Sequence, residues 1–141
     1  MKSTVALVIL LLFTFHYQAQ IIEVHVKKLD WVDRNLETNE EIDRGSKECD
    51  ANYSFDLKKR KLHYINKKRN IDKFADILDF NVKDGIYSIQ YKDVYRFDES
   101  IVWYPTAIID IDNHKMQMVF PEPPRELIGY DNFTEFDLKI K

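Results

Sequence analysis

The sequence contains only three glycines, Gly45, Gly85 and Gly129, and they lie far apart. Loops that cradle phosphates in P-loop or dinucleotide-binding proteins need several closely spaced glycines, so neither kind of site is predicted. The Gly-x-Ser-x-Gly turn of the α/β-hydrolases is also missing. These absences exclude the common nucleotide-binding and serine-hydrolase motifs.

Cysteine and histidine, the usual metal ligands, are scarce as well. Cys49 is the only cysteine, which excludes a disulfide or a thiolate zinc cluster within one chain and predicts an inert free thiol. The histidines outside the N-terminal apolar run, His25, His63 and His114, form no close pair and no HExxH motif. The acidic residues from Asp110 onward lack the glycine and the distal glutamate of a calcium loop. We therefore predict no metal and no cofactor.

The N-terminus has the features of a secretory signal peptide. Lys2 precedes an apolar run, Val5 to Phe13, and the small residue Ala19 follows. The run is about half of the roughly 20 residues that a membrane-spanning helix needs. We expect residues 1–19 to be removed and residues 20–141 to form a single β-rich domain, secreted or periplasmic, with no membrane span. A retained N-terminal anchor helix is the alternative.

The charge pattern does not favour nucleic acid. The formal net charge is −3, which gives no general attraction to polyanions. The two basic clusters, residues 58–61 and 67–69, fall at opposite ends of one predicted strand. We predict no nucleic-acid partner. Asn52 and Asn132 lie in Asn-x-Ser/Thr sequons, which matter only in a eukaryotic secretory pathway.

Alternation of apolar and polar residues, the period of a half-buried strand, dominates residues 20–141. About eight such strands, separated by turn residues, predict an all-β antiparallel fold built from hairpins, either a small barrel or a sandwich. Asp84-Gly85 predicts a two-residue type I′ turn, and Pro105 predicts a bend or a strand break. The helical spacing in residues 70–78 predicts one short helix, and residues 33–51 predict a long polar loop.

One pattern occurs twice, in residues 53–65 and again in residues 107–119. Each copy alternates, breaks at a polar quartet and alternates again, which is typical of a hairpin with a four-residue loop. We predict two hairpins of one register, with these opposite pairs: Leu57 with Leu62, and Ile111 with Met116. Ancient duplication and convergence on a favourable hairpin both explain the repeat.

The candidate ligand-binding residues lie on one long predicted strand, residues 86–97, and at the start of the run that follows it: Tyr87, Tyr91, Asp93, Tyr95 and Trp103. Tyrosine and tryptophan combine a large apolar ring with a polar atom, as in a ligand cavity, although aromatic residues more often fill a core. Asp93 interrupts this face. Either a β-bulge turns it to solvent, which we favour, or it points inward as the polar anchor of an apolar site.

The leading functional hypothesis is a non-enzymatic extracytoplasmic module that binds a small apolar or aromatic ligand or a protein partner. It rests on the predicted signal peptide, the missing catalytic motifs and the aromatic sheet. One alternative is a small hydrolase in which Asp56, opposite His63 in the predicted register, orients that imidazole as a general base. A structural envelope component is another. Cross-strand pairs such as Asp56 with His63 are more often plain sheet stabilisers.

Overall fold

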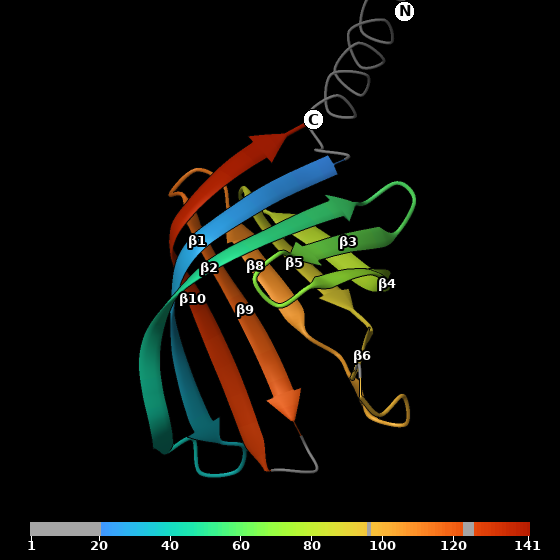
Figure 1. The fold of residues 1–141 in the computed structure, drawn as a ribbon. Coiled ribbons are helices and arrows are strands. Elements are labelled where there is room, and N and C mark those ends of the chain that lie inside the picture. Colours follow the sequence, from blue (N-terminus) through green and yellow to red (C-terminus); the bar gives the residue numbers. More distant parts are fainter. Residues whose placement is uncertain (1–20, 96, 123–125) are drawn as a thin grey trace, which may run out of the picture.

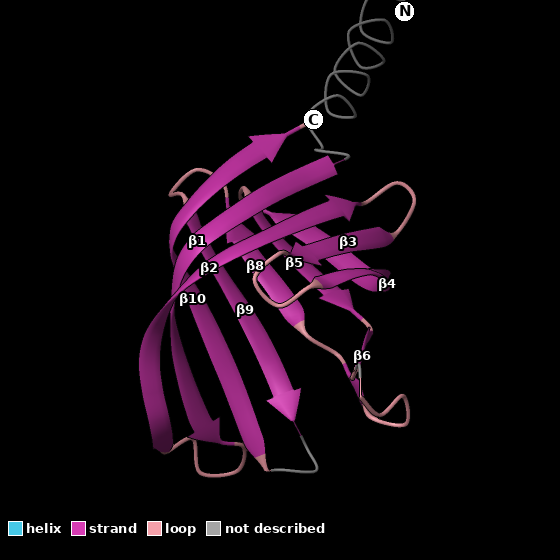
Figure 2. Ribbon diagram, in the orientation of Figure 1, coloured by secondary structure: helices cyan, strands magenta, loops and turns pink. Residues whose placement is uncertain are grey.

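The computed structural model describes residues 21–95, 97–122 and 126–141, so the predicted signal peptide lies outside the described residues. Eight strands form one closed antiparallel barrel, and two form a short hairpin beside it (Figures 1 and 2). The described residues contain no helix. In chain order the strands are β1 (Ile21–Asn35), β2 (Glu41–Asp56), β3 (Lys61–Asn66), β4 (Ile71–Lys83), β5 (Ile86–Tyr91), β6 (Asp93–Val94), β7 (Val102–Trp103), β8 (Thr106–Asp110), β9 (Lys115–Glu122) and β10 (Leu127–Ile140).

The barrel is an up-and-down meander in which each strand pairs with its neighbours in the chain, apart from the β6–β7 hairpin inserted between β5 and β8. Pairing of β1 with β10 closes the ring, although the lower half of β2, before Ala51, pairs only with β1. This confirms the predicted all-β antiparallel fold and decides for a barrel over a sandwich. The β1–β2 turn, the end of β9 and the start of β10 lie at the bottom of Figure 1, which we call the lower end of the barrel.

The prediction of a short helix at residues 70–78 is wrong, because the chain from Ile71 onward belongs to β4. Its inward face follows the strand period, whereas Phe74 and Leu78 from the expected helical face are 69% and 44% exposed. A helix of two turns is marginal by itself. The first half of β4, Ile71–Asp76, pairs with β3, and the second half, from Ile77 to Lys83, pairs with β5. This pairing links the two parts of the barrel, so tertiary pairing overrides the local pattern.

The long polar loop predicted over residues 33–51 is also wrong. Its two ends are the lower halves of β1 and β2, joined by a short turn at residues 36–40. The alternation was hidden because the inward positions here are polar or small, among them Asp33, Lys47 and Cys49. Gly45 lies opposite Trp31, and a Cβ on this glycine would come within 2.7 Å of the indole ring. The glycine therefore makes room for the tryptophan.

One turn design recurs at four hairpins. In each hairpin, an Asp or Asn (Asx) side chain at the end of a strand accepts a hydrogen bond from the backbone N–H of the residue three positions later. The residue that follows this donor has positive φ. Asp and Asn favour such local bonds, and αL geometry reverses the chain. The Asx residue and its positive-φ partner are Asn35 and Asn39, Asp56 and Arg60, Asn66 and Asn70, and Asp110 and His114.

The repeated pattern is thus a turn signal, and its register differs from the predicted one. The opposite pairs are Phe55 with Leu62 and Ile109 with Met116, a shift of two residues in both hairpins. The two hairpins do share one register, as predicted. A shift of two leaves the same side chains on the inner face, but it removes Asp56 from the position opposite His63. The type I′ turn is confirmed, with positive φ at Asp84 and Gly85.

The upper part of the barrel interior is a packed apolar core. Inward side chains from all the long strands fill it, as expected for an eight-stranded barrel. The largest fully buried side chains are Phe55, Ile22, Leu62, Ile89, Ile109, Met118, Val24 and Val26. The lower part of the interior has a different composition, and the candidate site lies there.

Candidate functional site

A cavity of about 410 Å³ occupies the lower part of the barrel. Three inward positions that carry little or no side chain, Ala51, Ala75 and Gly129, line it and leave it unfilled. The long lower halves of β1, β2 and β10 extend its wall below the packed core (Figure 1). The volume lies within the range of roughly 300–1,000 Å³ found for small-molecule sites.

Aromatic side chains form much of the cavity wall. The Tyr53 ring lies 4.8 Å from that of Tyr64 and 5.8 Å from that of Phe133, centroid to centroid. Across the barrel, the Tyr91 hydroxyl donates to the Met118 sulfur over 3.6 Å. Burial raises the pKa of Tyr53 and of Tyr91 well above the usual value, so both stay neutral. The wall is therefore apolar in body, with hydroxyl groups along it.

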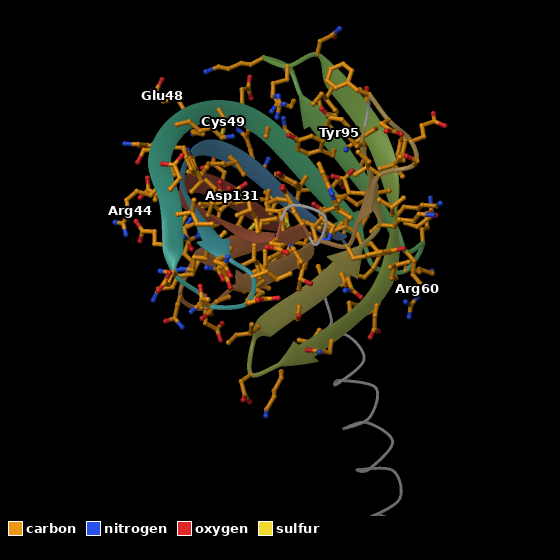
Figure 3. All side chains as sticks on the ribbon, turned by 90° about the horizontal axis from the view of Figure 1, so that it is seen from below. Arg44, Glu48, Cys49, Arg60, Tyr95 and Asp131 are labelled. Atoms are coloured by element: carbon orange, nitrogen blue, oxygen red, sulfur yellow. The ribbon has the colours of Figure 1, made fainter. Side chains whose placement is uncertain are left out.

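Asp131 of β10 is the one carboxylate deep in this wall. Figure 3, which looks into the lower end, shows it inside the ring of strands, whereas Arg44 and Arg60 point outward. None of the described residues hydrogen-bonds to its carboxylate or lies within ion-pair distance of it. Burial raises the pKa of Asp131 to about 6, Lys47 opposes this rise, and Asp33 adds to it.

A second carboxylate, Asp93, also lines the cavity and is paired. Its Oδ1 lies 2.5 Å from the Lys73 Nζ, with the two side chains 16% and 34% exposed. The strand does break beside Asp93, because β5 ends at Tyr91 and β6 begins at Asp93. The break does not turn Asp93 to solvent, so the favoured bulge is wrong. The inward arrangement is the correct one, with Lys73 satisfying the charge.

The β6–β7 hairpin adds aromatic side chains to the cavity wall. Tyr95, Phe97 and Trp103 all line it, and the Tyr95 ring lies 5.5 Å from Phe97 and 5.6 Å from Trp103. Phe97 is 71% exposed although it is a large apolar side chain. Pro105 produces the predicted strand break between β7 and β8 and places this hairpin outside the barrel ladder.

Four of the five predicted ligand-binding residues line this cavity: Tyr91, Asp93, Tyr95 and Trp103. Tyr87 does not. It lies higher on β5, opposite Ile109, and is a buried part of the packed core. Strand alternation placed Tyr87 and Tyr91 on the same face but could not tell which level of the barrel is filled and which is hollow.

Sequence reasoning missed three cavity residues that matter here: Tyr53, Tyr64 and Asp131. The two tyrosines had a usable signal, because both fall on the inward face of the first predicted hairpin. Asp131 had none, since Gly129 suggested a turn there and the polar inward positions interrupt the apolar alternation of β10.

The histidines do not form the proposed catalytic pair. Asp56 accepts a hydrogen bond from the Lys59 backbone in its turn, whereas the His63 Nε2 lies 2.7 Å from Asp72 Oδ1 and its ring stacks on Phe74 at 4.2 Å. His63 does not line the cavity. This correction removes the residue pair on which the hydrolase alternative rested.

Cys49 lines the cavity, and its Sγ lies 3.6 Å from the Val26 carbonyl oxygen. Burial raises the pKa of this thiol, which disfavours the reactive thiolate. In the part of the chain that the structure describes, no cluster of three or more acidic, histidine or cysteine side chains is arranged to hold a metal ion. The same residues include no helix with the length and apolar character of a membrane span.

Neither a scan of protein-family models nor a search of curated proteins finds a significant match to this chain.

Proposed function

We propose that this protein is a binding module that holds one small ligand with an apolar or aromatic body inside its barrel. The observation that supports this most strongly is the aromatic-lined cavity of about 410 Å³ at the lower end. Apolar walls with a few placed polar groups are typical of small-molecule sites, and eight-stranded barrels are wide enough to hold one small ligand. The proposal does not include catalysis.

The size of the cavity should determine binding. Ala75 lines the cavity from β4, and replacing it with leucine adds three carbon atoms to the hollow. Thr134 is exposed on β10, so Thr134→Leu adds similar apolar bulk on the outside and is a matched control. The neutral fluorescent probe N-phenyl-1-naphthylamine reports transfer into an apolar site.

We expect the wild type and Thr134→Leu to bind this probe with one-to-one stoichiometry and the same affinity. Ala75→Leu should bind it about tenfold more weakly or worse, because an overfilled apolar site costs roughly 1–3 kcal/mol. Thermal unfolding of each variant checks that the barrel is intact. Equal probe binding by Ala75→Leu and Thr134→Leu, or no one-to-one binding by the wild type, would contradict the proposal.

We further propose that the protein works outside the cytoplasm after residues 1–19 are removed. The apolar run and the small residue Ala19 support this. Intact-mass analysis of the exported protein should give an N-terminus at or within about two residues of Gln20. Retention of residues 1–19 in the exported protein would overturn this assignment.

A further inference from the structure

The acidic residues of the cavity differ in whether they have an ion-pair partner. Asp93 has Lys73 as an ion-pair partner. Asp131 has no such partner among the described residues; its side chain is partly buried in the wall, and its carboxylate oxygens stay accessible to solvent. The charged groups that act on it are Lys47 from β2, which favours its ionised form, and Asp33 from β1, which disfavours it. A carboxylate that is partly withdrawn from water and has no ion-pair partner carries a desolvation cost in the empty protein.

The groups around Asp131 are aromatic. Tyr53 and Tyr91 are close enough that its charge acts on both hydroxyl groups. The Tyr64 ring is tilted against that of Tyr53, and its hydroxyl accepts a hydrogen bond from Asn66 Nδ2 over 3.1 Å. Tyrosine faces attract cations through the ring quadrupole, and more strongly where water is excluded.

We propose that the ligand of this cavity is an organic cation, in which a protonated amine binds Asp131 and an apolar or aromatic body lies against Tyr53 and Tyr91. This inference rests on the proposed function above and specifies its ligand class. A neutral ligand would leave the Asp131 carboxylate unpaired. The cavity wall carries four acidic residues (Asp33, Asp93, Glu122 and Asp131) and three basic ones (Lys47, Arg69 and Lys73, the last paired with Asp93), so its charged groups favour a cation over an anion by one formal charge.

The proposal has a pH dependence with a definite sign. The ammonium group needs an ionised Asp131, and protons compete for the same carboxylate. Because the pKa of Asp131 in the empty protein is about 6, amine affinity should be constant well above pH 6 and fall below it. At pH 5 only about a tenth of the carboxylates are ionised, so binding should be about tenfold weaker than at pH 8. Tyr53 and Tyr91 stay neutral throughout this range.

The test uses three ligands of nearly equal size: 4-phenylbutylamine, 4-phenylbutan-1-ol and 4-phenylbutanoate. Isothermal titration calorimetry at pH 8 compares the wild type with Asp131→Asn, and a second titration of the amine is made at pH 5. Asp137→Asn is the matched control, because Asp137 lies on the same strand but is exposed and pairs with Lys27 outside the barrel.

At pH 8 we expect the amine to bind the wild type and Asp137→Asn about 10- to 100-fold more tightly than the alcohol, as for a hydrogen bond to a charged group. The butanoate should bind most weakly. In Asp131→Asn the advantage of the amine should disappear while the alcohol still binds. Asp131→Asn should also lose the pH dependence between pH 5 and pH 8.

The outcomes separate the two proposals. Binding of the alcohol without preference for the amine would overturn the cation inference and leave the binding module standing. Preference for the butanoate would do the same and point to Lys47. An amine advantage that survives in Asp131→Asn would show that another group binds the cation and would also overturn the inference. Failure of all three ligands and of the naphthylamine probe would overturn both proposals.

Discussion

Replacing Asp131 with asparagine should stabilise the empty protein at neutral pH. Asparagine has nearly the shape of the protonated acid but cannot ionise. Burial raises the folded-state pKa of Asp131 to about 6, above the ordinary aspartate value of 3.8. At 1.36 kcal/mol per pKa unit, this difference amounts to about 3 kcal/mol of folding free energy that ionisation removes, an upper value since the group is not fully buried.

The sign follows from linkage. A carboxylate with a raised folded-state pKa favours folding most below its unfolded pKa, and this advantage is lost as pH rises through the folded-state pKa. The wild type should therefore lose stability relative to Asp131→Asn between about pH 4 and pH 7. Urea unfolding of both proteins at pH 4 and pH 8 gives the difference in each condition. Subtracting one from the other cancels any packing or hydrogen-bonding cost of the amide.

Asp137→Asn is a control of opposite sign. The hydrogen bond from Lys27 lowers the pKa of Asp137, so its carboxylate stabilises the fold above its unfolded pKa, and this contribution is lost as pH falls. This variant should be slightly less stable than the wild type at pH 8 and equal to it at acidic pH. A stability difference between Asp131→Asn and the wild type that is the same at pH 4 and pH 8 would refute the burial of an unpaired, ionisable Asp131.

Three further variants test other parts of the structure. Gly45→Ala should lower the free energy of unfolding by roughly 1–3 kcal/mol, because its Cβ would lie 2.7 Å from the Trp31 ring; an unchanged midpoint in urea would contradict this contact. Lys73→Met and Asp93→Asn should be coupled by about 1 kcal/mol in a double-mutant cycle, and additive effects would show that the ion pair contributes nothing. Asp110→Ala should lower the melting temperature at pH 7 but not at acidic pH. The hydrogen bonds from Asn113 lower the pKa of Asp110, so their contribution to stability is lost when Asp110 is protonated. An equal effect at both pH values would contradict that role.

Much of the fold could be predicted from local physical chemistry. Alternation identified the strands that carry apolar residues on their inner face, such as the start of β1 and the whole of β5. Asp84-Gly85 identified its turn, because both residues adopt positive φ there. The repeated pattern marked two of the four hairpins that use an Asx residue and a positive-φ residue four positions later.

The fold was predicted wrongly where the side chains that point into the barrel are not apolar. Lys47, Asp33 and Lys73 all line the cavity, so the segments around them lack the strand pattern and suggested a loop or a helix. Their strand conformation comes from pairing with neighbours distant in the sequence, which satisfies the backbone and closes the barrel. No short window of sequence contains that information.

The sequence by itself thus determined an antiparallel all-β chain with an aromatic face that begins at Tyr87 and continues through Tyr91, because side-chain periodicity is a local property. Only the tertiary structure decided that Tyr87 lies in a packed core and Tyr91 beside a cavity, since that depends on which side chains the other strands present at the same level. The same holds for Asp131. Its position beside Asp33 of β1 and Lys47 of β2, without an ion-pair partner, arises because a residue's neighbours across a closed barrel are set by register and not by sequence distance.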